Sequence, residues 1–181
     1  MTVETVQTFY GILALVAFAI VIGIVALRLL AFASEAAADA FDGVAGAIAP
    51  NALAMGWIVA FLATAGSLYF SEVAHFEPCT LCWYQRIAMY PLVVVFAIAA
   101  ARRETAGALY AAGLAAIGAV IAAYHVALEW FPALDSGTCD PDNPCTLVWF
   151  RVFGFISLPT LALAAFLLIL TFSLIRLRRS S

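Results

Sequence analysis

Five apolar stretches, each long enough to cross a lipid bilayer, constrain the fold of this chain more than any other feature. They are separated by polar segments and cover residues 9–33, 52–70, 83–101, 106–128 and 152–175. A transmembrane helix needs about 20 mostly apolar residues, because it rises about 1.5 Å per residue through a hydrocarbon core of roughly 30 Å. Hydrophobic residues make up 66% of the 181 residues, more than a soluble domain of this size could bury. The sequence therefore predicts an all-α integral membrane protein.

The segment 34–51, between the first two apolar stretches, has a different pattern. Phe41, Val44 and Ile48 recur at helical spacing, and Ser34 could cap the start of a helix. This pattern favours a short amphipathic helix lying on the membrane surface. A solvated linker is the alternative, and the sequence alone leaves both open.

The arginines indicate how the spans are oriented. If five spans alternate in direction, six of the eight basic residues fall on one side, namely Arg28, Arg102, Arg103, Arg176, Arg178 and Arg179. Cytoplasmic loops carry an excess of basic residues. We therefore expect a multi-pass protein of the cell membrane with its N-terminus outside and its C-terminus in the cytoplasm. All four cysteines then lie on the extracytoplasmic side, where disulfides persist.

Cys79 and Cys82 form a Cys-x-x-Cys pair at the start of the third apolar stretch. On a helix these two residues and Arg86 are spaced i, i+3 and i+7, so they share one face. Pro78 suits the first helical position. Both sulfurs then lie near a helix N-terminus, where the helix dipole favours a thiolate. The spacing favours a redox-active pair over a structural disulfide.

The depth of these residues in the membrane follows from counting along the spans. About 20 residues back from Arg102 lies Cys82, and about 20 residues forward from Thr105 lies His125. Cys82 and His125 should therefore share one layer at the outer boundary, with Arg86 slightly deeper and facing the bundle. Ionisable residues at such depth suggest a functional site. A snorkelling anchor for Arg86, and a histidine bonded to a neighbouring helix for His125, are the alternatives.

The second cysteine pair, Cys139 and Cys145, lies in the long polar loop 129–150. Glycine and prolines in this loop suggest a mobile, exposed disulfide that can meet a soluble partner. Electrons could then pass between the two pairs by thiolate attack through mixed disulfides. Such a relay must discharge two electrons, and a lipid-dissolved acceptor near Arg86 and His125 would serve.

Other chemistries fit the residues less well. A zinc site made of four cysteines is disfavoured, because five residues separate Cys139 from Cys145, wider than the usual ligand spacing. A haem held by His75 and His125 is disfavoured because His75 lies in a loop. A structural membrane protein, whose two disulfides only staple its outer loops, is the main alternative to an enzyme.

Several linked motifs resemble one known family. They are Cys79-Thr80-Leu81-Cys82-Trp83-Tyr84-Gln85-Arg86 followed by Tyr90-Pro91-Leu92, then Tyr124-His125, Pro144-Cys145 and Gly154-Phe155-Ile156-Ser157-Leu158-Pro159. Over about residues 53–175 the chain resembles the DsbB-type membrane disulfide-generating quinone reductases, most closely their BdbC-like branch. The resemblance implies a four-helix transmembrane bundle over 52–176, preceded by an extra transmembrane helix and linker over 1–51 and followed by a cytoplasmic tail over 177–181.

The resemblance also implies roles for individual residues. It implies a quinone of ubiquinone or menaquinone type as oxidant, and a DsbA/BdbD-like thioredoxin-fold thiol oxidase as partner. Cys79 and Cys82 would form the quinone-facing pair, with Cys82 engaging the quinone as a thiolate. Gln85, Arg86 and His125 would sit at the quinone, where Arg86 and His125 stabilise its developing negative charge. Cys139 would form the mixed disulfide with the partner, and Cys145 would pair with Cys79 in an interloop intermediate.

The chain departs from the family pattern in its extra first span and in the short gap between Cys139 and Cys145. Vitamin K epoxide reductases also join a Cys-x-x-Cys pair to quinones and are a further alternative. Those enzymes carry the active pair late in the chain, whereas Cys79 and Cys82 follow the second of five spans.

Overall fold

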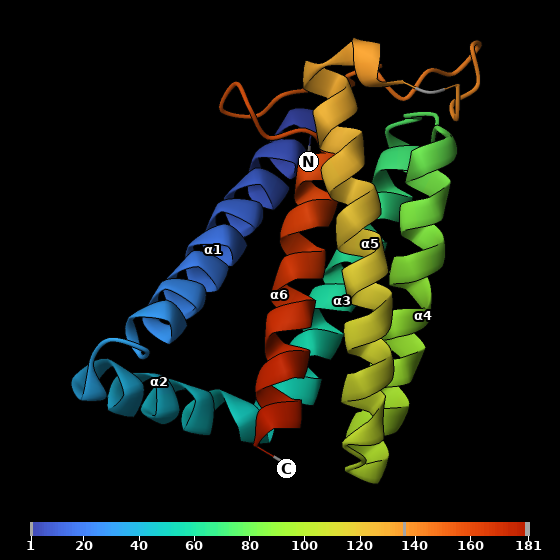
Figure 1. Ribbon diagram of the computed structural model, residues 1–181. Coiled ribbons are helices and arrows are strands. Elements are labelled where there is room, and N and C mark those ends of the chain that lie inside the picture. Colours follow the sequence, from blue (N-terminus) through green and yellow to red (C-terminus); the bar gives the residue numbers. More distant parts are fainter. Residues whose placement is uncertain (1, 136, 180–181) are drawn as a thin grey trace.

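The computed structural model describes residues 2–135 and 137–179, and all of its long elements are helices (Figure 1). In chain order they are α1 (Val3–Leu30), α2 (Glu35–Ile48), α3 (Ala52–Leu68), α4 (Thr80–Arg102), α5 (Ala106–Trp130) and α6 (Leu158–Arg178). A 3-10 turn (Ala49–Asn51) joins α2 to α3, a π-type turn (Tyr69–Val73) extends α3, and a 3-10 turn (Pro132–Leu134) follows α5. In the described part of the chain, five helical segments are long and apolar enough to cross a membrane. The predicted all-helical membrane fold is thereby confirmed.

Helices α3 to α6 form a bundle, and α1 packs against it through α6. The face of α5 that meets its neighbours is built from small residues, with Ala108, Ala111 and Ala115 fully buried. Small residues allow the close helix contacts on which membrane bundles depend, since lipid removes the hydrophobic driving force between helices. The largest core side chains, Phe96 and Phe166, fill the space that these residues leave.

Figure 1 shows α1 leaning away from the bundle toward its lower end, where α2 crosses beneath α1 and α6. Phe41 and Ala45 are the buried residues of α2. The guanidinium groups of Arg28 and Arg178 lie 5.5 and 4.9 Å from the centre of the Phe41 ring. The segment between the first two spans is therefore helical rather than a solvated linker, although the Ser34 side chain makes no capping hydrogen bond.

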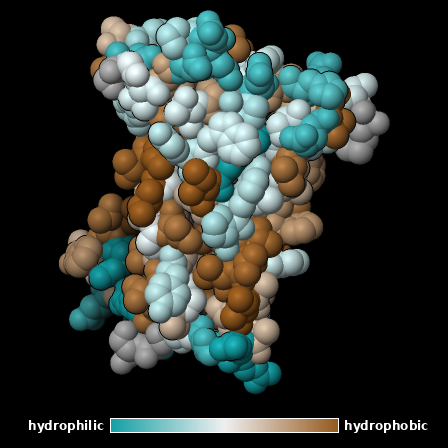
Figure 2. Space-filling model, turned by 90° about the vertical axis from the view of Figure 1, so that its right-hand side faces the viewer, coloured by the Kyte–Doolittle hydropathy of each residue, from teal (hydrophilic) through white to brown (hydrophobic). Residues whose placement is uncertain are grey.

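The surface carries the pattern expected of a membrane protein. Figure 2 shows hydrophilic residues gathered at the two ends of the molecule and hydrophobic residues across the middle. The apolar band includes exposed aliphatic side chains of α4 and α5, such as Val94, Ile98, Ile117 and Val120. Such side chains suit contact with lipid tails.

Several helix boundaries differ from the sequence prediction. Helix α6 begins at Leu158 instead of Val152, because Val152 and Ile156 exchange two backbone hydrogen bonds across a turn. In that turn Phe153 and Gly154 have φ values of 56° and 82°, which a right-handed helix cannot contain.

Three further differences lie at the start of α4, at the end of α5 and at the end of α6. Cys79 caps α4 and Thr80 is its first residue, so Pro78 precedes the cap instead of occupying the first helical position. Glu129, expected in the loop, belongs to the last turn of α5 and is buried. Arg178, expected in a tail, is the last residue of α6.

Candidate redox site

The first cysteine pair is formed by the N-terminal turn of α4. Cys79 has an extended backbone, and its sulfur accepts a hydrogen bond from the Cys82 backbone N–H at 3.4 Å. Both residues are free thiols, with their sulfurs 3.1 Å apart. Cys79 is buried and Cys82 is partly exposed. A cysteine in the capping position directs its sulfur at the unpaired N–H groups of the first turn, which stabilises negative charge on that sulfur.

His125 of α5 connects this turn to the neighbouring helices. It is buried, and its Nδ1 accepts a hydrogen bond from the Gln85 amide nitrogen at 3.0 Å. Its Nε2 therefore carries the proton, which it donates to the Cys145 carbonyl oxygen at 3.0 Å. The same Nε2 lies 3.7 Å from the Cys79 sulfur. The structure brings His125 to the cysteine pair, as the depth count predicted, and also bonds it to the adjacent helix.

The Cys79 thiol, which lies just outside the spanning part of α4, is strongly acidified. A hydrogen bond from the Cys82 thiol, opposed by burial and assisted by His125, lowers the pKa of Cys79 to about 4. A thiol with this pKa is a thiolate at neutral pH, and the thiolate is the form that reacts in disulfide exchange. The negative charge therefore rests on Cys79 when both cysteines of this pair are reduced.

Cys139 and Cys145 form a disulfide in the loop between α5 and α6. The expectation of an exposed disulfide is wrong, because the exposed fractions of these residues are 8% and 1%. They pack with Cys79, Leu81 and Leu128 in one buried cluster. The loop is also held to the start of α4 by a hydrogen bond from the Asn143 amide to the Pro78 carbonyl at 3.2 Å. The four cysteines thus lie together where the loop packs on the start of α4.

Arg86 points away from His125, toward α3. Its Nε donates to the Ser67 hydroxyl at 3.1 Å, and its Nη2 donates to the Ser67 carbonyl at 3.2 Å. The guanidinium also lies 5.1 Å from the centre of the Trp83 ring. The sequence prediction that Arg86 faces the bundle is confirmed. Ser67 was not predicted, although a polar side chain inside an apolar span is a signal for an interhelical hydrogen bond.

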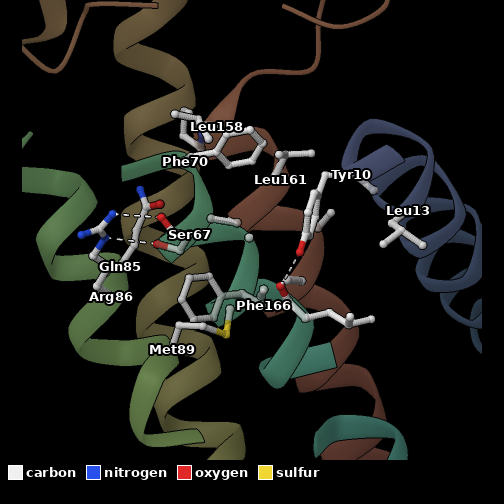
Figure 3. A pocket seen from close by; sticks show the side chains of 18 of the residues that line it. Tyr10, Leu13, Ser67, Phe70, Gln85, Arg86, Met89, Leu158, Leu161 and Phe166 are labelled. Carbon is white, nitrogen blue, oxygen red and sulfur yellow. Dashed lines mark hydrogen bonds between the residues drawn. The ribbon is translucent and has the colours of Figure 1, made fainter. Parts of the chain in front are cut away.

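A cavity of about 260 Å³ opens beside this arginine (Figure 3). Cys82, Gln85 and Arg86 line its polar end, and apolar side chains of α1, α3 and α6 line the rest. His125 and Cys79 do not line this cavity; they line a smaller pocket of about 10 Å³ together with Cys82. Of the three residues predicted to hold a quinone, Gln85 and Arg86 therefore face the large cavity, and His125 lies behind Gln85.

Glu129 is a second residue that the sequence prediction did not include in the site. It lines the smaller pocket, one helical turn after His125, and accepts a hydrogen bond from Ser157 at the start of α6. Ser157 is also within 3.0 Å of the Thr160 hydroxyl. The spacing of four residues from His125 was the available signal, because residues i and i+4 of a helix lie on one face.

The ligand atoms of Cys79, Cys82 and His125 lie within 4.8 Å of one another, a spacing that a metal ion could span. The hydrogen bond from Nε2 of His125 to the Cys145 carbonyl, however, uses the nitrogen that faces the sulfurs. A protonated ring nitrogen has no lone pair for a metal. The geometry of this cluster therefore suits thiol chemistry better than metal binding.

Comparisons with known proteins agree with this geometry. The family model described as "Disulfide bond formation protein DsbB" matches residues 49–176. A probable disulfide formation protein of Oceanobacillus iheyensis is 42% identical over 132 residues, covering 72% of this chain and 91% of its own. A probable disulfide formation protein C of Bacillus cereus is 46% identical over 125 residues, covering 68% and 90%. The disulfide bond formation protein C of Bacillus subtilis is 45% identical over 117 residues, covering 64% and 85%.

No solved structure gives a significant match to this chain. The family match covers nearly all of the bundle and all four cysteines, whereas α1 and α2 precede the matched residues. A multi-pass helical fold, a thiol pair beside a disulfide and the matched sequence all agree. This chain belongs to the DsbB family of disulfide bond formation proteins.

Proposed function

We propose that this membrane oxidoreductase generates disulfides by passing electrons from a reduced thioredoxin-fold thiol oxidase to a membrane quinone of ubiquinone or menaquinone type. Its membership of the disulfide formation family supports the thiol chemistry. The quinone, the donor and the role of each residue are the parts that we propose. The donor would be DsbA/BdbD-like and would act on the extracytoplasmic side, with the N-terminus of the chain outside and the C-terminus in the cytoplasm.

The position of Cys82 is the observation that carries this proposal. On one side its sulfur lies 3.1 Å from that of Cys79, within the cluster of four cysteines. On the other side Cys82 lines the large apolar cavity together with Arg86. A single sulfur therefore borders both the thiol relay and a chamber suited to a lipid-soluble oxidant.

The sulfur exchanges proceed in four balanced steps. A thiolate of the donor attacks Cys139 of the Cys139–Cys145 disulfide, which forms a mixed disulfide and releases Cys145 as a thiolate. The second donor thiol then resolves the mixed disulfide, so that the donor leaves oxidised and Cys139 is reduced. Cys145 attacks Cys79 of the Cys79–Cys82 pair, which a quinone would have oxidised beforehand, so that the interloop disulfide forms and Cys82 is released as a thiolate. Cys139 then attacks Cys145, which restores the Cys139–Cys145 disulfide and leaves Cys79 and Cys82 both reduced, as they are in this structure.

The residues at the polar end of the cavity fit a quinone. When bound, a quinone supplies the oxidising capacity, since it takes up two electrons and two protons and leaves as a quinol. Arg86 carries five N–H donors, and its two hydrogen bonds to Ser67 fix the guanidinium in the cavity wall. Gln85 offers an amide there, and His125 holds that amide in place from behind. These donors stabilise negative charge that develops on a carbonyl oxygen.

The test is quinone reduction by the purified full chain in lipid nanodiscs. The electron donor is a reduced thioredoxin-fold thiol oxidase, and the acceptor is a quinone with a single isoprenoid unit. The wild-type chain should turn over, and Cys82→Ser should abolish turnover because no thiolate remains at the cavity wall. Tyr110→Phe, on the exposed face of α5, is the matched control and should retain activity. Unchanged turnover in Cys82→Ser would remove Cys82 from the mechanism, and no turnover in the wild type would overturn the proposal.

A further inference from the structure

Helix α1, which precedes the part of the chain matched by the family, supplies a wall of the large cavity. Six residues of α1 line it, at positions that share one face of the helix: Tyr10, Leu13, Ala14, Val16, Ala17 and Ile20. Tyr10 and Ile20 are ten residues apart, which is about 15 Å along a helix and about half of the hydrocarbon thickness. The cavity thus extends from the redox layer to the middle of the membrane.

The upper part of α1 is fixed across α3 by Tyr10. Its hydroxyl donates to the Leu62 carbonyl at 3.1 Å, and its ring lies over Gly66. A Cβ at Gly66 would come within 2.6 Å of this ring, so the glycine makes the close approach possible. Tyr10 also meets the ring of Phe70 edge-on, with centroids 5.9 Å apart. Figure 3 shows Tyr10 and Leu13 on one side of the cavity and Arg86 on the other.

Further down, α1 packs against α6 through small residues. Ala14 and Ala17 are buried against a cluster that includes Ala164 and Leu168, and both alanines also line the cavity. Their short side chains leave the space that a larger residue would fill. Helix α1 therefore forms the side of the cavity that would be open between α3 and α6 in the four-helix bundle alone.

The cavity has the chemistry of an elongated amphiphile. Most of its polar residues lie at the same end as Cys82, around the C-terminal end of α3 and the start of α4: Ser67, Ser71, Glu77, Gln85 and Arg86. The lining residues of α6, such as Leu161, Ala164 and Leu168, are apolar, and Ala17 of α1 packs in one cluster with Ala164 and Leu168. A molecule with a polar, reducible head and a long hydrocarbon tail matches this distribution.

We propose that α1 forms the outer wall of a binding site for the prenyl tail of the quinone, with Ala14 and Ala17 setting the width of that site. This inference rests on the proposed function. Lipid is as apolar as the cavity, so burying the tail gains little from the hydrophobic effect. Helix α1 therefore acts through its shape. It leaves room for one prenyl tail along its face, so that the quinone ring stays beside Cys82.

The first experiment measures equilibrium binding to the full chain in nanodiscs by quenching of tryptophan fluorescence. Two benzoquinones are compared, one with a single isoprenoid unit and one with several. Ala17→Phe should weaken binding of the long-tailed quinone about tenfold, because added atoms in a filled site cost about that much. Binding of the short-tailed quinone should not change. Ala19→Phe, on the exposed face of the same helix, is the matched control and should alter neither.

A second experiment uses the wild-type chain, so it does not depend on the folding of a variant. A quinone with a photoreactive group at the end of its tail is crosslinked, and the labelled peptides are mapped. Label within residues 10–20 supports the inference, and label confined to α3, α4 and α6 overturns it. Equal binding of the long-tailed quinone to Ala17→Phe and to the wild type also overturns it, while reduction of the short-tailed quinone would leave the proposed function intact. If neither quinone binds to the wild type, the proposed function fails first, and this inference fails with it.

Discussion

At the scale of single residues, Cys79 has the most unusual surroundings in the site. Its sulfur receives a backbone N–H of the α4 N-terminus, lies 3.1 Å from the Cys82 sulfur and lies 3.7 Å from Nε2 of His125. Each of these groups favours the charged form of the sulfur, and burial opposes it. The hydrogen bonds outweigh burial, since the pKa of Cys79 falls to about 4.

This assignment predicts the pH dependence of the reduced protein. The ultraviolet absorbance of the Cys79 thiolate should persist from neutral pH down to about pH 4. Because the folded pKa of Cys79 lies below the ordinary value of 9.0, ionisation of this group stabilises the reduced fold fully above about pH 9. That contribution decreases as the pH falls and is lost below about pH 4.

Variants separate the two sulfurs in this titration. Cys82→Ala removes the thiol hydrogen bond that is the largest cause of the shift, so it should move the pKa of Cys79 back toward its ordinary range. Cys79→Ser should remove the low-pH transition altogether. A titration that is the same in Cys82→Ala and in the wild type would contradict the hydrogen bond as the cause.

Sequence spacing predicts which residues meet at this site, but it does not predict which of them line the large cavity and which line the smaller pocket. Counting along the spans placed Cys82 and His125 in one layer, because helical rise fixes depth. It could not place Arg86 and His125 on opposite sides of Gln85, because that depends on how α4 is rotated between α3 and α5. The contact of Arg86 with Ser67 depends on the same rotation, which the pattern of a single helix does not encode.

At the scale of helices, close approach between α5 and α6 depends on Gly118. A Cβ at this position would lie 2.2 Å from the ring of Phe166, which is fully buried and cannot move aside. Gly113 belongs to the same helix, and no heavy atom lies within 4 Å of a Cβ built there. The two glycines therefore test packing and helix propensity separately.

Gly118→Ala should lower the free energy of unfolding by about 1–3 kcal/mol, the usual cost of overpacking a core. Gly113→Ala should leave it unchanged or raise it by up to about 1 kcal/mol, because alanine favours the helix. The measurement is thermal unfolding of both variants in one detergent. Equal melting temperatures for the two would show that α5 and α6 do not pack as described.

Helix α2 is held by an aromatic contact more than by its ion pairs. The Phe41 ring is buried between Arg28 and Arg178, whereas the Asp42 carboxylate, 3.4 Å from Arg179, is 53% exposed. Burial of a large ring contributes more than an exposed ion pair, which is worth less than about 1 kcal/mol.

Phe41→Ala should therefore release α2. We expect amide hydrogen exchange over residues 35–48 to become about a hundredfold faster, from a loss of about 3 kcal/mol of docking free energy. Asp42→Ala is the control on the neighbouring residue and should change exchange by less than about fivefold. A larger effect of Asp42→Ala than of Phe41→Ala would reverse the ranking of these contacts.

The start of α6 shows where a prediction from apolar residues alone is wrong. Residues 152–157 are mostly apolar, so the pattern extended the last span through them. The turn formed by Phe153 and Gly154 overrides that pattern, since a positive φ at two successive residues ends any right-handed helix. The span itself was predictable, because its apolar length is set by the bilayer, but its start was not.

At the scale of the whole molecule, most of the arginines lie at one end and the four cysteines lie at the other. In Figure 1 the α4–α5 turn, α2 and the C-terminus lie at one end, and the loop between α5 and α6 lies at the other. The first end carries Arg102, Arg103 and Arg178, and the second carries the disulfide Cys139–Cys145. An excess of arginine marks the cytoplasmic end.

This separation predicts the orientation in the membrane. In a background with all four native cysteines replaced by serine, a single cysteine at Glu104 should react with a membrane-impermeant maleimide only after the cells are opened. A single cysteine at Asp142 should react in intact cells. The reverse result would place the redox site on the cytoplasmic side and would contradict the proposed orientation.

The contacts of His125 Nε2 link the charge on Cys79 to the loop that carries Cys145. One imidazole hydrogen faces two acceptors, the Cys79 sulfur and the Cys145 carbonyl, and it cannot serve both fully. When Cys79 is a thiolate, its negative charge attracts this hydrogen, and the hydrogen bond from His125 to the Cys145 carbonyl is weakened. When Cys79 is in a disulfide it carries no charge, and the hydrogen bond to the carbonyl is stronger. In the proposed mechanism, the loop that meets the donor is therefore held less tightly when Cys79 is a thiolate and more tightly when Cys79 is in a disulfide.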